Sequence, residues 1–172
     1  MTATLPNIDE AIYQAVRWYD EGLSFSESGQ FVAAGELLDR ALRSFEKHFG
    51  SECPDVANVL NARGLVAETL GDVSLARASF ERAVRIIKPV FEETAPDRDV
   101  ARIHVQALNN LGQLERNVGH YDAAGRIFDE ALQIARRWLG ETDLDTSMIL
   151  KSLENSSQGY KASFHFVRVY AI

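Results

Sequence analysis

The sequence has little cysteine and no long apolar run, and each of these two features excludes a class of protein. The single cysteine, Cys53, cannot form an internal disulfide and cannot by itself supply a structural zinc site. No stretch approaches the roughly 20 apolar residues of a membrane-spanning helix. The N-terminal segment MTATLPNIDE lacks the basic start and the apolar run of a signal peptide. We therefore expect a soluble, cytoplasmic protein that does not enter a membrane.

Positive charge is also scarce. The chain has 18 Lys and Arg against 25 Asp and Glu, which gives a formal net charge of −7. Phosphate-rich partners require clustered Lys and Arg. We therefore expect neither nucleic acid nor an anionic membrane as a partner, although a local basic patch is compatible with this balance.

Motifs that carry catalysis or metal binding are missing as well. The four histidines, at His48, His104, His120 and His165, form no HxxxH or HExxH pair. Cys53 precedes Pro54 and has no neighbouring base, and the glycines do not cluster into a phosphate-binding loop. We therefore predict a protein that is not an enzyme and that takes no metal and no cofactor.

What the sequence does contain is a threefold internal repeat. Two glycines stand seven residues apart in each copy, and recurring columns of alanine and of Leu or Phe follow them. The glycine pairs are Gly22 and Gly29, Gly64 and Gly71, and Gly112 and Gly119. The later columns are Ala34, Ala76 and Ala124, then Leu38, Phe80 and Phe128, then Ala41, Ala83 and Ala131. Such recurrence indicates a repeat architecture.

Each copy has the pattern of two helices joined by a tight break. In the second copy Leu60, Gly64 and Ala67 recur at helical spacing, and Gly71 with Asp72 follows as a helix stop and an N-cap. A glycine inside a helix costs about 1 kcal/mol relative to alanine, so the first glycine of each pair needs a structural reason. We expect it to let the second helix approach closely, with the alanine of that helix facing it. Stacked hairpins bury a continuous core, so the sequence predicts an all-α fold.

The repeat resembles the tetratricopeptide (TPR) family, whose pattern reads W-x2-L-G-x2-Y and then A-x3-F. The first copy matches as Trp18-x2-Glu21-Gly22-x2-Phe25 and Ala34-x3-Leu38, and the third as Leu111-Gly112 and Ala124-x3-Phe128. The first glycines are 42 and then 48 residues apart, which resembles the kinesin-light-chain type with its longer helices. The resemblance implies a right-handed α-α superhelix, a TPR solenoid of three helix hairpins plus a C-terminal capping helix.

We therefore predict one TPR-like domain over residues 1–172. Its repeats lie at approximately 12–50, 54–93 and 98–140, and the capping helix lies at 142–158. The remaining stretch, 159–172, ends in the apolar and β-prone run SFHFVRVYAI. Two interpretations stay open for it: a flexible tail, or a segment that docks on the terminal helix or on a partner.

In such arrays the first helix of each hairpin lines a concave surface. The residues predicted to face this surface, called here the first-helix stripe, are Tyr19, Leu23, Asn58, Asn61, Leu65, Glu68, Gln106, Asn109, Asn110, Gln113 and Arg116. Amide side chains carry both a donor and an acceptor, so they can hold the backbone of an extended peptide. The resemblance implies this role for Asn61, Asn109 and Asn110. The alternative is a solvated polar face.

The stripe has no lysine, which does not support the lysine-rich carboxylate clamp of chaperone-binding relatives. We therefore predict a protein-protein interaction module, an adaptor or scaffold that binds a neutral or mixed-charge peptide or a partner helix in the groove. Two alternatives stay open. One is a structural protein that forms homo-oligomers through its C-terminal helix or tail, and the other is a regulatory domain that senses peptides.

Overall fold

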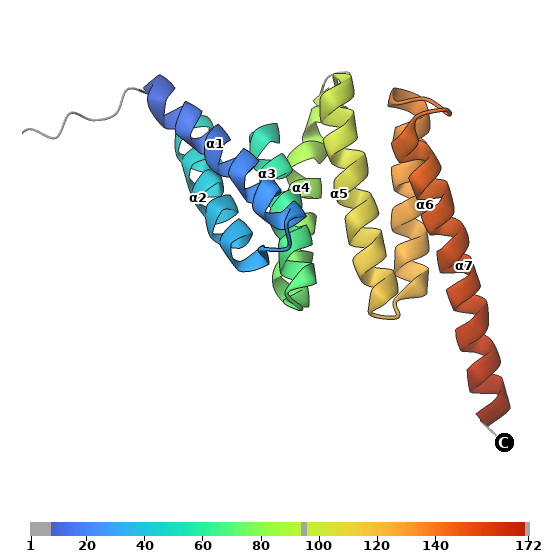
Figure 1. Ribbon diagram of the computed structural model, residues 1–172. Helices are drawn as coiled ribbons and strands as arrows, with labels where there is room; N and C mark the ends of the chain where they lie inside the picture. Colours follow the sequence, from blue (N-terminus) through green and yellow to red (C-terminus); the bar gives the residue numbers. More distant parts are fainter. Residues whose placement is uncertain (1–7, 94–95, 171–172) are drawn as a thin grey trace, which may run out of the picture. The chain divides into compact units, whose positions relative to one another are not determined.

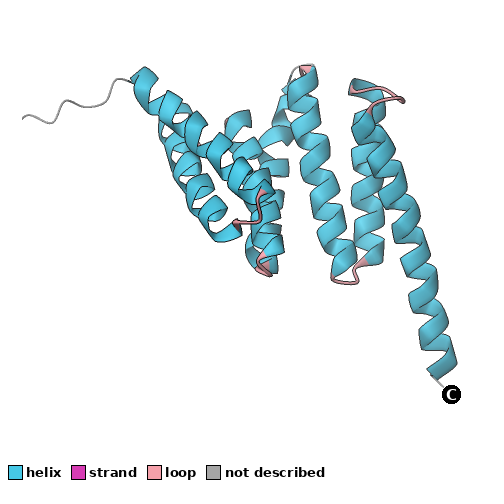
Figure 2. Cartoon of the chain, in the orientation of Figure 1, coloured by secondary structure: helices cyan, strands magenta, loops and turns pink. Residues whose placement is uncertain are grey.

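The computed structural model describes residues 8–93 and 96–170, with side chains for 9–91 and 96–157. Within these ranges the chain forms seven α-helices and no strand (Figure 1; Figure 2). The helices are α1 (Ile8–Glu27), α2 (Phe31–Phe49), α3 (Pro54–Thr69), α4 (Val73–Glu93), α5 (Arg98–Asn117), α6 (Tyr121–Trp138) and α7 (Leu144–Tyr170). The predicted all-α helical-repeat fold is confirmed.

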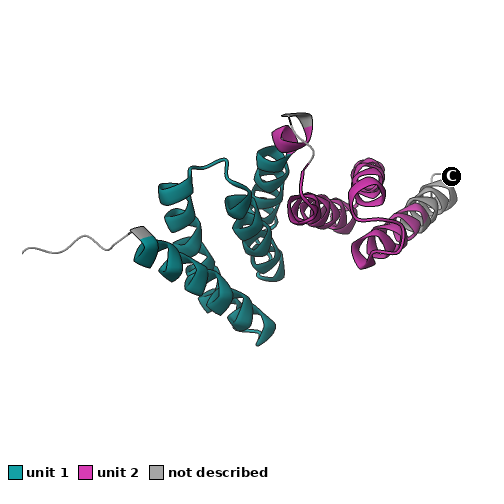
Figure 3. Ribbon diagram, turned by 90° about the horizontal axis from the view of Figure 1, so that it is seen from above, with its two compact units in different colours: residues 1–87 teal, residues 88–172 magenta. Residues whose placement is uncertain are grey.

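Two compact units divide the chain, residues 1–87 and residues 88–172, where the sequence predicted one domain (Figure 3). The boundary falls within α4, after Ile87. In the first unit α2 packs against both α1 and α3, and in the second unit α6 packs against both α5 and α7. The predicted hairpins correspond to the pairs α1 with α2, α3 with α4, and α5 with α6.

The first glycine of each pair makes room for a large side chain. A Cβ atom at Gly64 would lie 2.4 Å from Cε1 of Phe80, and one at Gly112 would lie 2.6 Å from Cε1 of Phe128. Gly22 has the same relation to Leu38, whose Cγ would be 3.0 Å away. The expected alanine contact is found at Gly22, where a Cβ atom would lie 3.4 Å from the backbone oxygen of Ala34. At all three glycines, however, the nearest atoms belong to the ring or branched side chain one turn further along the second helix, which reaches back over the glycine.

The second glycine of each pair ends the first helix in the way the sequence predicts. Gly71 has a φ of 84°, a left-handed conformation that costs a residue with a Cβ atom but not glycine. The next residue, Asp72, accepts a hydrogen bond from the backbone N–H of Leu75 at 2.9 Å. Asp72 is thus the predicted N-cap of α4, and one dipeptide both stops α3 and starts α4.

The last helix is longer than the predicted capping helix. It begins at Leu144 and its backbone stays helical to Tyr170, past residue 158 where we placed the end of the cap. No proline follows Leu144, and Gly159 is the single glycine after that point, so the chain contains little that would stop a helix. Most of the tail assigned to 159–172 is therefore helical, while the side chains from 158 onward and residues 171–172 lie outside the described part.

Candidate functional site

The predicted stripe of the first unit joins α1 to α3. The side chains of Tyr19 on α1 and Asn58 on α3 are hydrogen-bonded. Burial raises the pKa of Tyr19, and the hydrogen bond to Asn58 opposes part of that rise. Two large side chains earlier on α1, Tyr13 and Val16, are exposed. Tyr13 was missed by the sequence analysis because only residues matching the repeat columns were considered.

The remaining stripe residues of this unit differ in how far their side chains are exposed. Leu65 is 44% exposed, whereas Asn61 is 6% exposed, and Leu23 is half-buried. Asn61 and Glu68 each already take part in an interaction within the protein. The accessible part of this stripe is therefore largely apolar, and Asn61 does not belong to a solvated polar face.

On α5 of the second unit, the stripe residues share one face of a single helix. Asn109 is 7% exposed, and its carbonyl oxygen Oδ1 is buried without a hydrogen-bond partner among the described residues. Asn110 has an interaction within the protein, and Gln113 and Arg116 are half-buried. A buried acceptor left unpaired costs about 1–3 kcal/mol. Asn109 is therefore the stripe residue with a clear capacity to take a further hydrogen bond.

The N-terminal end of the same stripe is held by α7. Gln106 donates from Nε2 to Oδ1 of Asp145 at 3.5 Å, and one turn earlier Arg102 donates from Nε to Oδ2 of Asp145 at 3.0 Å. Arg98 and Arg102 also contact Oδ2 of Asp143, at 2.8 and 3.2 Å. Gln106 is thus a structural residue that helps to fix the start of α7 against α5.

These contacts stabilise the charged form of Asp143. Burial acts to raise the pKa of Asp143, but the N–H of Asp145 and the guanidinium groups of Arg98 and Arg102 outweigh it, and the pKa is lowered. The sequence analysis missed this cluster because the recurring columns of the repeat do not include Arg98, Arg102, Asp143 or Asp145. The spacing of Arg98, Arg102 and Gln106, one turn apart on one face, is the signal that could have indicated it.

Comparison with protein families accounts for the repeat. Two models of the tetratricopeptide repeat match the chain, one over residues 14–88 and the other over residues 105–145. The chain belongs to the TPR family. A comparison with curated proteins finds no match.

Solved TPR structures share this fold. The chain is similar to the kinesin-light-chain-like BtubC (BKLC) from P. vanneervenii, with a TM-score of 0.76 and 18% identity over 93% of this chain. It spans 60% of the BtubC chain. It is also similar to the first TPR of Spaghetti (RPAP3), bound to the HSP90 peptide SRMEEVD, with a TM-score of 0.61, 12% identity, and coverage of 87% of this chain and 94% of that one. The C-terminal TPR-containing domain of Plasmodium falciparum PFL2275c has a TM-score of 0.60 and 17% identity, with coverage of 92% and 96%. At these identities the likeness concerns the fold.

His104 and Cys53 of this TPR chain sit in structural surroundings. His104 is 2% exposed, its ring lies 4.9 Å from that of Phe91, and burial together with the charge of Lys88 lowers its pKa to about 4. Burial raises the pKa of the Cys53 thiol, which donates a hydrogen bond to Asp55 at 3.3 Å. Such a thiol is a poor nucleophile.

Two further properties of the described residues bear on function. No group of three or more His, Cys, Asp or Glu side chains among them is arranged to hold a metal ion. None of the described helices combines the length and the apolar character needed to cross a membrane.

Proposed function

We propose that this TPR chain is a non-catalytic adaptor that binds an extended segment of a partner protein along the stripe of α5. The observation that carries the proposal is Asn109, whose Oδ1 lacks a partner within the described protein. This oxygen is buried in the structure, so it accepts a backbone N–H from a ligand when the Asn109 side chain turns outward on binding. Gln113 and Arg116 continue the same face toward the end of the helix and remain accessible.

The chemistry of the stripe favours a neutral or mixed-charge ligand. The TPR of Spaghetti (RPAP3) is bound to the HSP90 peptide SRMEEVD, which contains three acidic residues. The stripe of this chain has Arg116 and Glu68 and no lysine. Backbone recognition by the amides of α5 is the mode that these residues support.

The test is capture of partners from an extract of the native cell, followed by titration of the identified segment by isothermal calorimetry. We expect Asn109→Ala to weaken binding about tenfold or more, since the ligand N–H then loses its acceptor in a buried site. Gln133→Ala, which removes an exposed amide on α6, is the matched control and should bind like the wild type. Equal affinity of the Asn109→Ala and wild-type chains, with helicity unchanged, would contradict the proposal.

A second candidate function is self-association through α7. Leu144 and Met148, one turn apart at the start of this helix, are 74% and 47% exposed. Two exposed apolar side chains on one face can pack against a second copy. Light scattering of the wild type and of Leu144→Lys with Met148→Lys decides between the two functions, because a monomer in both cases excludes this contact.

A further inference from the structure

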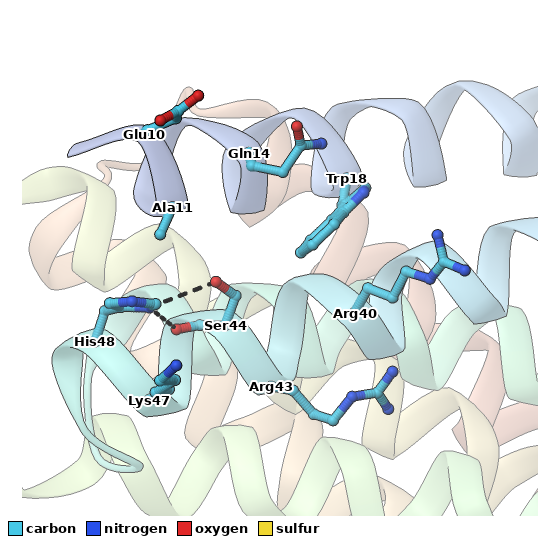
Figure 4. Close-up of a pocket in the computed structure, with 9 residues that line it drawn as sticks. All are labelled: Glu10, Ala11, Gln14, Trp18, Arg40, Arg43, Ser44, Lys47 and His48. Carbon is cyan, nitrogen blue, oxygen red and sulfur yellow. Dashed lines mark hydrogen bonds between the residues drawn. The ribbon is translucent and has the colours of Figure 1, made fainter. Parts of the chain in front are cut away.

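A basic cleft lies between α1 and α2, and the stripe residues have no part in it. It has a volume of about 600 Å³ and receives Ala11 and Trp18 from α1 and Arg40, Arg43 and Lys47 from α2 (Figure 4). The stripe residues Tyr19 and Leu23 are not among its lining residues. The cleft is therefore separate from the surface assigned above.

The floor of the cleft is apolar and its rim is charged. In Figure 4 Ala11 and Trp18 point from α1 toward α2, with Ser44 opposite them. Ala11 and Trp18 are two helical turns apart, which corresponds to roughly 10 Å along α1. His48 closes one end, where its Nδ1–H donates to the carbonyl oxygen of Ser44 at 2.7 Å. Gln14 lines the cleft between Ala11 and Trp18, and the length of this floor matches two turns of a helix laid along it.

The charge of the cleft is opposite to that of the chain. Three cations, Arg40, Arg43 and Lys47, face one lining carboxylate, that of Glu10, which leaves a local charge of about +2 on a protein of net charge −7. Among the residues that the structure describes, none of these three cations has a carboxylate within ion-pair distance, in contrast to Arg17, which pairs with Glu21. Like charges one or two turns apart on a helix repel each other, so an anionic partner here relieves a repulsion.

Elsewhere in this protein a third helix packs against a pair of helices. The α5–α6 pair receives α7, which packs against both helices, and α2 receives α3 on another of its faces, where Asp39 pairs with Arg63. The cleft face of α1 and α2 has no third helix among the described residues. Residues 1–7, which precede α1, contain no Asp or Glu, so they do not offer the complementary charge.

We propose that this cleft is a second docking site, for an acidic amphipathic helix of a partner protein. Apolar side chains of that helix rest on Ala11 and Trp18, and carboxylates on its flank pair with Arg40, Arg43 and Lys47. The site goes beyond the α5 stripe in both place and chemistry, because it selects a helix by charge whereas the stripe holds an extended backbone.

The test uses a short synthetic helical peptide of Leu, Glu and Ala, with Leu on one face and Glu on both flanks. In a Trp138→Phe background Trp18 is the single tryptophan, so its fluorescence reports on occupancy of the cleft. We expect the acidic peptide to shift this emission and Arg43→Glu with Lys47→Glu to weaken binding about tenfold or more. Arg85→Glu with Lys151→Glu changes the charge equally at exposed positions outside the cleft, and we expect its affinity to stay near that of the wild type.

Several results would overturn the proposal. In the first, the wild type does not bind the acidic peptide. In the second, a peptide with Lys in place of Glu binds as tightly as the acidic peptide. In the third, the cleft variant and the control variant lose peptide affinity to the same extent. Light scattering adds one more: a wild-type dimer that Arg43→Glu with Lys47→Glu converts to a monomer shows that a second copy occupies the cleft. If Asn109→Ala loses peptide binding while Arg43→Glu with Lys47→Glu retains it, the peptide binds at the α5 stripe. This result also contradicts the proposed docking site in the cleft.

Discussion

Replacing Gly112 by alanine is a sharp test of the packing that defines this repeat. The added methyl group would lie 2.6 Å from Cε1 and 2.9 Å from Cδ1 of Phe128, whereas carbon atoms normally approach to roughly 3.5–4.0 Å. The ring is fully buried, so it has little room to withdraw. Overpacking of this kind costs about 1–3 kcal/mol, and the gain in helix propensity returns about 1 kcal/mol. We expect the variant to lose up to about 2 kcal/mol of unfolding free energy.

Gly125→Ala is the matched control. Gly125 lies inside α6, and a Cβ atom there would meet nothing within 4 Å. Only the helix propensity changes, so we expect a gain of about 0.5–1 kcal/mol. The same substitution on two neighbouring helices should therefore shift stability in opposite directions, with a difference of about 2 kcal/mol.

The assay is urea unfolding followed by tryptophan fluorescence in a Trp18→Phe background, where Trp138 reports on the second unit. A second variant, Gly112→Ala with Phe128→Leu, should be more stable than the sum of its two single changes predicts, because the smaller side chain accommodates the new methyl group. If Gly112→Ala is as stable as Gly125→Ala, the large side chain is not what requires glycine at this position, and the explanation of the repeat column fails.

Two further predictions concern charge. The pKa of His104 is lowered from 6.5 to about 4 in the folded protein, so the unfolded state binds more protons than the folded state between these two pH values. The free energy of unfolding should therefore fall by about 3 kcal/mol as the pH drops through this window. Urea unfolding at several pH values should show this slope in the wild type, and the slope should be lost in His104→Leu. Asp143→Asn removes the carboxylate shared by Arg98 and Arg102. Hydrogen exchange of the backbone amides at the start of α7 should therefore accelerate, while exchange in α1 stays unchanged. Equal protection of α7 in the variant and the wild type would contradict the role assigned to this cluster.

The fold was predictable from the sequence because glycine and alanine columns record where helices stop and where they pack. Gly71 with Asp72 is an example, since both residues act on the backbone next to them. The partner of Gly112 was not predictable in the same way. Column spacing identifies the residues that recur, but which of Ala124 and Phe128 covers the glycine depends on side-chain reach, and the longer side chain covers it.

The candidate site was less predictable, because exposure and pairing arise from contacts between distant residues. Gln106 reads as a free amide on a polar face, yet it contacts Asp145, which is 39 positions further along the chain. Asn109 carries the same amide group on the same face, and its Oδ1 has no partner in the described part of the chain. The sequence identified the face, and only coordinates separate the amide that holds the protein together from the one that can hold a ligand.

The two proposed surfaces depend on different physical terms, which makes them separable in one titration. Binding in the cleft relies on three cations at exposed positions, so it should weaken steadily as salt screens their field over a Debye length of about 10 Å at 0.1 M. Binding at Asn109 relies on a hydrogen bond formed in a buried site, which salt screens little. A partner whose affinity is insensitive to salt therefore points to the α5 stripe, and one whose affinity falls with salt points to the cleft between α1 and α2. A single chain with a net charge of −7 can in this way select an acidic helix locally while it repels acidic proteins in general.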